Sequence, residues 1–235
     1  TSCDFINNQA VIGLDTFPVG GALGFFYYDN NPQNDSIIIT GCNFQGNSAE
    51  LRGGGIAYFN SFGTDNLFVI EDCEFSENSA VLSGGGVYFV QFEGGSPTGT
   101  QLALIDNEFD DNTATNGGAI NFIGVEGEDG DYQITDCDFN GNASIQAPTD
   151  TVSLGGAILV QFTGDDFQNN HFLIEDCSLD NNSAEFGGGG LLYYGPAGSD
   201  NHFEMNDCEV NGNRAPTAGG VALIEGGTNN TALVI

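Results

Sequence analysis

The feature that most constrains the fold is an internal repeat, which recurs seven times in 235 residues. Each copy has a cysteine slot, an apolar residue two positions later, an asparagine five positions after the slot, and then a glycine pair before an apolar run. Successive slots lie 30 to 40 residues apart. Because repeats of this length stack on their neighbours, the sequence predicts one elongated solenoid domain over residues 1–235.

Three columns of equivalent residues define the repeat. The Cys slot holds Cys3, Cys42, Cys73, Asn107, Cys137, Cys177 and Cys208. The Phe slot holds Phe5, Phe44, Phe75, Phe109, Phe139, Leu179 and Val210. The Asn slot holds Asn8, Asn47, Asn78, Asn112, Asn142, Asn182 and Asn213.

Each copy contains two or three short strand patterns and no helical pattern. An apolar strand leads to the Cys slot, as at 67–70, and we expect it to continue through the Phe slot, so that Cys and Phe share one face. A second apolar strand follows the glycine pair, whose residues allow a positive φ at a corner. One copy cannot bury its apolar face alone, whereas stacked coils can.

The predicted fold class is therefore all-β, a single-stranded parallel β-helix (β-solenoid) of about seven coils. Equivalent slots would stack at about 4.8 Å per coil. An asparagine in the Asn slot would satisfy the backbone of a turn and bond the amide of the next asparagine.

The copies read FINN with GGAL, FQGN with GGGI, FSEN with GGGV, FDDN with GGAI and FNGN with GGAI, and the last two carry LDNN and VNGN. This pattern resembles the repeat of polymorphic outer-membrane proteins, the chlamydial-type autotransporter passengers. The resemblance covers nearly the whole chain. It implies a right-handed parallel β-helix that is extracellular or at the cell surface, often with an adhesive role.

The charge is strongly acidic, with 33 acidic residues against two arginines and a net charge of −31. Nucleic acids and anionic membrane surfaces need a basic face, so neither is expected as a partner. No apolar run is long enough for membrane insertion. The charge suits a soluble surface in cation-rich surroundings.

The sequence pattern predicts that the two ends of the chain are in phase. Written end to end, the junction Ile235-Thr1-Ser2-Cys3 reproduces Ile39-Thr40-Gly41-Cys42, and neither end shows a capping element. We therefore expect copies to stack head to tail, with a junction at Thr1, Ser2, Cys3, Val234 and Ile235. The alternative is a segment of a longer repetitive chain.

The cysteines and histidines are the first candidate sites. Disulfides between stacked cysteines are permitted by distance, but parallel Cβ directions favour buried free thiols. The asparagine at 107 is expected to break the cysteine column. His171 and His202 each lie six residues before a Cys slot and should stack on adjacent coils. They are either half-exposed strand starters or a metal-binding pair.

Acidic loops provide a further candidate site. Asp129, Asp131, Asp165 and Asp166 could offer oxygen ligands to calcium, although they match no calcium-binding motif. Solvated loops are the default interpretation, so no cofactor is expected and calcium is the alternative.

In the strands that follow the glycine pair, one set of alternate positions is expected to face the core. The other set is also partly apolar, as at Phe26, Phe59, Tyr88 and Tyr194. It could form an external patch for a lateral partner, or the long loops could cover it.

The preferred function is an extracellular structural protein whose subunits stack head to tail into a filament or surface fibre. An adhesin-type binding module that grips a glycan or a neighbouring protein surface is the alternative. A polysaccharide-acting enzyme is third. We do not expect an enzyme, because no coil looks specialised and Arg52 and Arg214 belong to copies several coils apart.

Overall fold

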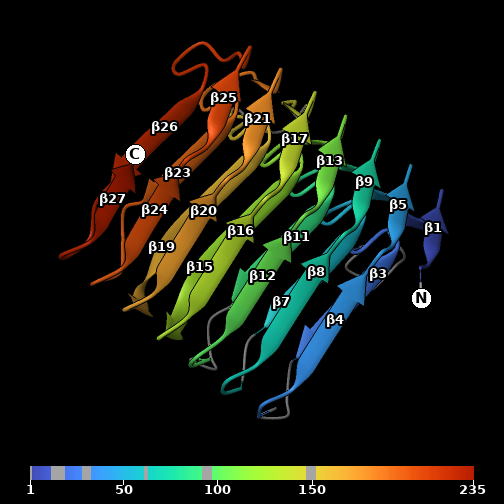
Figure 1. Ribbon diagram of the computed structural model, residues 1–235. Helices are drawn as coiled ribbons and strands as arrows, with labels where there is room; N and C mark the ends of the chain where they lie inside the picture. Colours follow the sequence, from blue (N-terminus) through green and yellow to red (C-terminus); the bar gives the residue numbers. More distant parts are fainter. Residues whose placement is uncertain (1, 12–18, 28–32, 61–62, 92–96, 147–151) are drawn as a thin grey trace.

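The computed structural model describes residues 2–11, 19–27, 33–60, 63–91, 97–146 and 152–235, and these contain strands and turns but no helix. All strand pairs are parallel, and they form four sheets wound into one solenoid (Figure 1). The predicted class, an all-β parallel β-solenoid, is confirmed. The described chain makes about six turns, with the partial turn β1–β3 before them and β27 after them.

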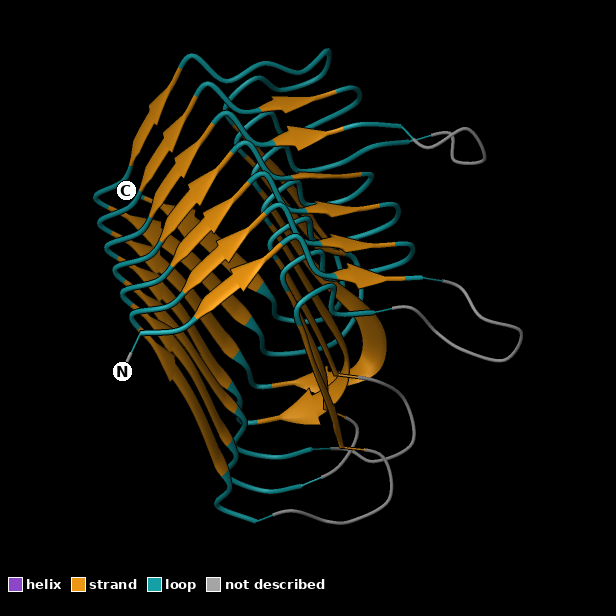
Figure 2. Ribbon diagram, turned by 90° about the vertical axis from the view of Figure 1, so that its right-hand side faces the viewer, coloured by secondary structure: helices purple, strands orange, loops and turns teal. Residues whose placement is uncertain are grey.

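Each turn visits the sheets in the order I, II, III and IV, and Figure 2 shows the sheets as separate layers around the solenoid. Sheet I contains β1 (Asp4–Ile6), β5 (Asn43–Gln45), β9 (Glu74–Ser76), β13 (Glu108–Asp110), β17 (Asp138–Asn140), β21 (Ser178–Asp180) and β25 (Glu209–Asn211). Sheet II contains β2 (Gln9–Ala10), β6 (Ser48–Ala49), β10 (Ser79–Ala80), β14 (Thr113–Ala114), β18 (Ala143–Ser144) and β22 (Ser183–Ala184).

The two sheets of longer strands complete each turn. Sheet III contains β3 (Leu23–Tyr27), β7 (Ile56–Asn60), β11 (Val87–Gln91), β15 (Ile120–Glu128), β19 (Ile158–Gln168), β23 (Leu191–Gly195) and β26 (Val221–Glu225). Sheet IV contains β4 (Ser36–Thr40), β8 (Leu67–Glu71), β12 (Gln101–Ile105), β16 (Asp131–Thr135), β20 (His171–Glu175), β24 (His202–Asn206) and β27 (Thr231–Val234). A full turn thus uses four strands, where the sequence predicts two or three.

A residue with positive φ lies at each corner of the coil. At the corner from sheet IV to sheet I this residue directly precedes the Cys slot, as with Asp72 at φ 54° and Asp106 at φ 54°. Asp and Asn are among the non-glycine residues that best tolerate this left-handed conformation. The prediction that one strand runs through the Cys slot into the Phe slot is wrong, because the chain turns at this residue and a new strand begins after the cysteine.

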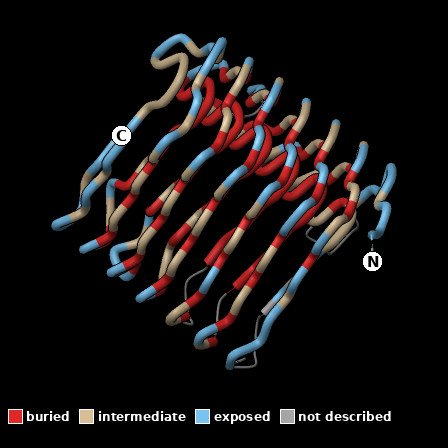
Figure 3. Tube along the Cα trace, viewed as in Figure 1, coloured by how far each residue is buried: buried red, intermediate tan, exposed pale blue. Residues whose placement is uncertain are grey.

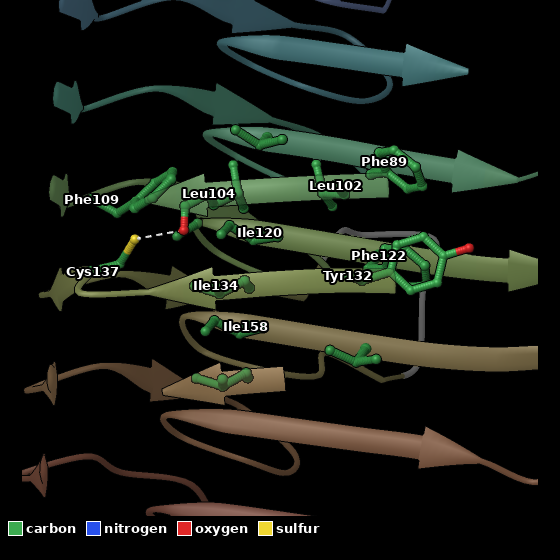
Figure 4. Close-up of a cluster of buried hydrophobic side chains, with 14 of the residues drawn as sticks. Phe89, Leu102, Leu104, Phe109, Ile120, Phe122, Tyr132, Ile134, Cys137 and Ile158 are labelled. Carbon is green, nitrogen blue, oxygen red and sulfur yellow. Dashed lines mark hydrogen bonds between the residues drawn. The ribbon is translucent and has the colours of Figure 1, made fainter. Parts of the chain in front are cut away.

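The core lies inside the coil and consists of stacked aromatic and aliphatic side chains. Rings in the Phe slot stack nearly parallel, with centroids 4.6 Å apart for Phe44 and Phe75 and 4.7 Å apart for Phe75 and Phe109. Sheet III contributes Phe89 and Phe122 from the facing side, and Figure 4 shows them against the inner residues of sheet IV. Buried segments therefore run along the inside of every central coil (Figure 3).

In sheet III, the side chains that alternate with the core-facing ones are also buried in the central coils. Phe59, Tyr88 and Val90 are at most 4% exposed and form a second cluster with Val19 and Ala57. Of the two alternatives, the structure shows a covered face rather than an exposed aromatic patch in these central coils. Position 28 lies outside the described residues. Phe26, in the first described strand of this sheet, is 45% exposed.

Candidate functional site

The Asn slot forms a continuous hydrogen-bonded column at the start of sheet II. Asn47, Asn78, Asn112, Asn142 and Asn182 are completely buried. Each backbone N–H and each side-chain amide donates to the Oδ1 of the asparagine in the next coil, at 3.0 Å for both bonds from Asn78 to Asn112. Each Nδ2 also donates to the Phe-slot carbonyl of the preceding coil, as from Asn78 to Phe44 at 2.8 Å.

This column has a direction. Asn8 donates to Asn47 at 2.8 Å, and at the other end Asn182 donates to Asn213 at 2.9 Å, so every step points toward the C-terminal coil. The first member therefore presents an acceptor oxygen to any coil before it, and the last presents donors to any coil after it. The two ends of the column are chemically complementary.

A second polar column lies at the corner from sheet III to sheet IV, seven residues before the Cys slot. Asn170 donates its backbone N–H and its Nδ2 to Asn201 Oδ1 at 3.1 and 3.0 Å, and Asn201 donates its backbone N–H to Asn230 Oδ1 at 3.0 Å. The sequence repeat did not predict this column. The constant offset from the Cys slot was the signal, but the position holds Asp35, Thr100 and Gly130 in other copies, which conceals it.

The Cys slot is a third column, and all six cysteines are free thiols in the structure. The sulfur of Cys73 accepts the backbone N–H of Cys42 at 3.3 Å. Cys137 lies with its sulfur toward the carbonyl of Leu104 at 3.5 Å, the contact drawn in Figure 4. Burial raises the pKa of the Cys73 thiol to about 11. A thiol that stays protonated in this way is a poor nucleophile and metal ligand.

Asn107 takes the same part in the Cys column. Its Oδ1 accepts the backbone N–H of Cys73 at 3.0 Å, and its Nδ2 donates to the carbonyl of Ile70 at 2.9 Å. The expectation that this asparagine breaks the column is wrong, because its amide makes the bonds that a thiol makes elsewhere.

The second glycine of each pair allows adjacent coils to approach closely at the start of sheet III. A Cβ on Gly118 would lie 2.1 Å from the carbonyl oxygen of Gly156 and 2.7 Å from the nitrogen of Ala143. A Cβ on Gly156 would lie 1.9 Å from the carbonyl oxygen of Gly189. Glycine is therefore required here by contact with backbone, as well as by φ at the residue before it.

Acidic side chains stack at the corner from sheet IV to sheet I. Asp72, Glu74, Asp106, Glu108, Asp136 and Asp138 line a small cavity of about 140 Å³ on this corner. Although Glu108 is exposed, local desolvation at this corner, and then the charges of Glu74 and other neighbours, raise the pKa of Glu108 above its ordinary value. The coil stacking thus places like charges together and makes this corner electrostatically costly.

The four calcium candidates do not converge. Asp129 Oδ1 accepts a hydrogen bond from Asn169 at 2.5 Å, and Asp131 accepts one from Gln133 at 2.8 Å. Asp165 and Asp166 lie exposed within β19. Among the described residues, the three-residue cluster with converging metal-ligand atoms is His171, His202 and Glu204 instead. The two histidines stack on adjacent coils, with ring centroids 5.5 Å apart.

The register at the C-terminal end differs by one residue from the sequence expectation. Val234 pairs with Met205, which continues the column of Ile39, and the carbonyl of Ile235 accepts the N–H of Asp207 at 3.1 Å. Ile235 therefore occupies the position of Thr40, not that of Ile39. The expected junction also includes position 1, which lies outside the described residues, and Ser2 and Cys3 are exposed.

The terminal coils expose positions that are buried elsewhere. Leu223 and Val234 are 41% and 47% exposed, although the equivalent Tyr193 and Met205 in the coil before are 0% and 1% exposed. Figure 3 shows this change along the last coil.

Comparisons with protein-family models, with curated proteins and with solved structures returned no match. The fold and its columns define the chain as a parallel β-solenoid repeat protein. None of the described residues forms a helix that could cross a membrane.

Proposed function

We propose that this chain is an extracellular structural protein whose coils continue from one copy to the next in a head-to-tail filament. The observation that carries the proposal is the directed Asn column. It offers an acceptor at Asn8 and donors at Asn213, so the C-terminal coil of one copy matches the N-terminal coil of another.

The two terminal coils contain corresponding strands in three of the four sheets, whereas sheet II ends at β22. Strands β25, β26 and β27 would add to β1, β3 and β4 in sheets I, III and IV, which continues each sheet in the same order. Burying Leu223 and Val234 in such a contact contributes about 1 kcal/mol each. This is small against the cost of association, so the hydrogen bonds along the sheet edges have to supply much of the rest.

The acidic surface sets the condition for assembly. Two copies with a net charge of −31 repel one another, and the repulsion is screened over about 10 Å in moderate salt. Filaments are therefore expected in high salt or with calcium present, and dissociation is expected at low ionic strength.

The experiment is electron microscopy and light scattering of the purified polypeptide across a salt series. Val234→Asn, which changes an inner position of the last coil, should prevent filaments. Leu233→Asn is the matched control, because Leu233 is adjacent to Val234 in sequence, is similarly exposed, and points to the outer face. Protein that stays monomeric at every salt concentration, or filaments unaffected by Val234→Asn, would refute the proposal.

A further inference from the structure

Two histidines lie side by side on the outer face of sheet IV. His171 opens β20 and His202 opens β24, and they are direct partners in the parallel register. Their rings stack with an interplanar angle of 13° and a centroid distance of 5.5 Å. They are the only histidines of the 235-residue chain.

Glu204 faces both rings from the same side of the sheet. It lies two residues after His202, so the alternation of a strand places both side chains on one face. Its Oε2 is 3.3 Å from His202 Nε2 and 3.8 Å from His171 Nε2. All three ligand atoms lie within 4.8 Å of one another. Ligand atoms around a tetrahedral Zn²⁺ with bonds of 2.0–2.2 Å are about 3.3–3.6 Å apart, so only small side-chain movements are needed.

A second layer of polar groups orients these three side chains. His171 Nδ1 lies 3.3 Å from Asp131 Oδ1, and His202 Nδ1 lies 2.5 Å from Thr231 Oγ1. With its proton on Nδ1, each ring can donate to this neighbour, and its Nε2 lone pair is then available to a metal ion bound next to Glu204. Carboxylates and other acceptors hold metal-binding histidines in this way.

Further hydrogen bonds fix the carboxylates of Asp131 and Glu204. Gln133 donates to Asp131 Oδ2 at 2.8 Å, and Asn206 donates to Glu204 Oε1 at 2.7 Å. The bond from Asn206 is made to Oε1, which leaves Glu204 Oε2 available to a further ligand.

The cluster is local to two coils. The column of His171 and His202 holds Ser36, Leu67, Gln101, Asp131 and Thr231 in the other coils. The column of Glu204 holds Ile38, Val69, Ala103, Gln133, Leu173 and Leu233. The repeat therefore does not require these side chains, and they coincide at one place on the surface.

We propose that His171 Nε2, His202 Nε2 and Glu204 Oε2 bind a divalent transition-metal ion, for which Zn²⁺ is the probe. Two imidazoles and one carboxylate suit Zn²⁺ and its first-row neighbours, whereas calcium and magnesium prefer oxygen ligands alone. The three side chains are 23% to 40% exposed, so a fourth position is open to water or to a ligand from another molecule. The ion would join the coils of β20 and β24 from outside.

The test is a Zn²⁺ titration of protein labelled with ¹⁵N-histidine, in physiological salt with millimolar calcium to occupy the general acidic surface. With only two histidines, the spectrum reports the site directly. Both Nε2 resonances should shift on addition of one equivalent of Zn²⁺, while both Nδ1 atoms keep their protons. Calorimetry should show at least a tenfold loss of affinity in His171→Asn, His202→Asn and Glu204→Gln.

Two controls separate this site from other zinc binding. Glu175→Gln removes a carboxylate from the same face of β20 and should leave Zn²⁺ affinity unchanged. Cys3→Ser removes the exposed thiol and should also leave it unchanged. The proposal is overturned if the histidine resonances do not respond, if calcium displaces the zinc, or if Cys3→Ser and not His202→Asn abolishes binding.

Discussion

Truncation of one asparagine in the middle of the buried Asn column should destabilise the solenoid more than any exposed asparagine does. Asn112 accepts two bonds from Asn78 and donates from Nδ2 to Phe75 O at 2.8 Å and to Asn142 Oδ1 at 3.0 Å. In Asn112→Ala all four contacts are lost. The side-chain amide of Asn78 keeps its bond to the carbonyl of Phe44. The backbone N–H of Asn78, however, loses its acceptor, Asn112 Oδ1, in a fully buried site.

The magnitude follows from these losses. An unsatisfied buried backbone group costs about 1–3 kcal/mol, and each further lost bond costs about 1 kcal/mol. With one unsatisfied backbone group and three further lost bonds, we expect the free energy of unfolding to fall by about 4–6 kcal/mol. Asn112→Asp should cost more, because its carboxylate would face the Phe75 carbonyl and the Asn142 oxygen without a proton to share.

Urea unfolding followed by far-UV circular dichroism measures this loss. Asn140→Ala is the matched control, since Asn140 is an exposed asparagine of the adjacent coil. Its cost should stay within about 0.5 kcal/mol. The reasoning fails if Asn112→Ala unfolds at the same urea concentration as Asn140→Ala, with the same slope.

Other columns yield further predictions. Gly118→Ala should prevent folding or reduce stability by more than 3 kcal/mol in thermal melts, because its Cβ would overlap the backbone of the next coil. A stable, native-like variant would contradict the close approach. In iodoacetamide labelling at neutral pH, Cys3 should react in the folded protein and Cys73 only after unfolding. The reason is that Cys3 is exposed, whereas burial raises the pKa of Cys73 to about 11. Labelling of Cys73 in the native protein would show that the coil opens there. The raised pKa of Glu108 means that the folded state binds this proton more tightly than the unfolded state, so its contribution to stability should rise as the pH falls from 7 toward its pKa. Glu108→Gln should stabilise the protein at neutral pH and weaken the salt dependence of its stability. Glu175→Gln should do neither, because the register partners of Glu175 are the uncharged residues Thr135 and Asn206.

The repeat columns were predictable because they depend on residue type at a constant position, and stacking follows from the failure of one copy to bury its own apolar face. The corner before the Cys slot was missed, although Ile70 and Cys73 are both buried and three residues apart. An odd separation is incompatible with one face of one strand, and the left-handed Asp72 between them resolves the conflict.

The surface chemistry was harder to predict. Asn107 looked like an interruption because residue type alone does not reveal that an amide and a thiol fill the same hydrogen-bonding role. The register at Val234 was ambiguous because the next residue is also β-branched and apolar, and only the pairing with β24 decides between them. The sequence did not predict Glu204 as a site residue, because Glu204 comes close to His171 through the pairing of β20 with β24 and not through proximity in sequence.

The constant position of the columns has a consequence for how such a chain can change length. Asp106 and Asp136 occupy the same corner, and each is followed by a Cys-slot residue. Deleting residues 107–136 would join Asp106 to Cys137 and keep every remaining column in register. Recombination between equivalent corners would thus lengthen or shorten the protein by whole coils without redesign of its interior, whereas insertions of any other size are confined to the loops between sheets.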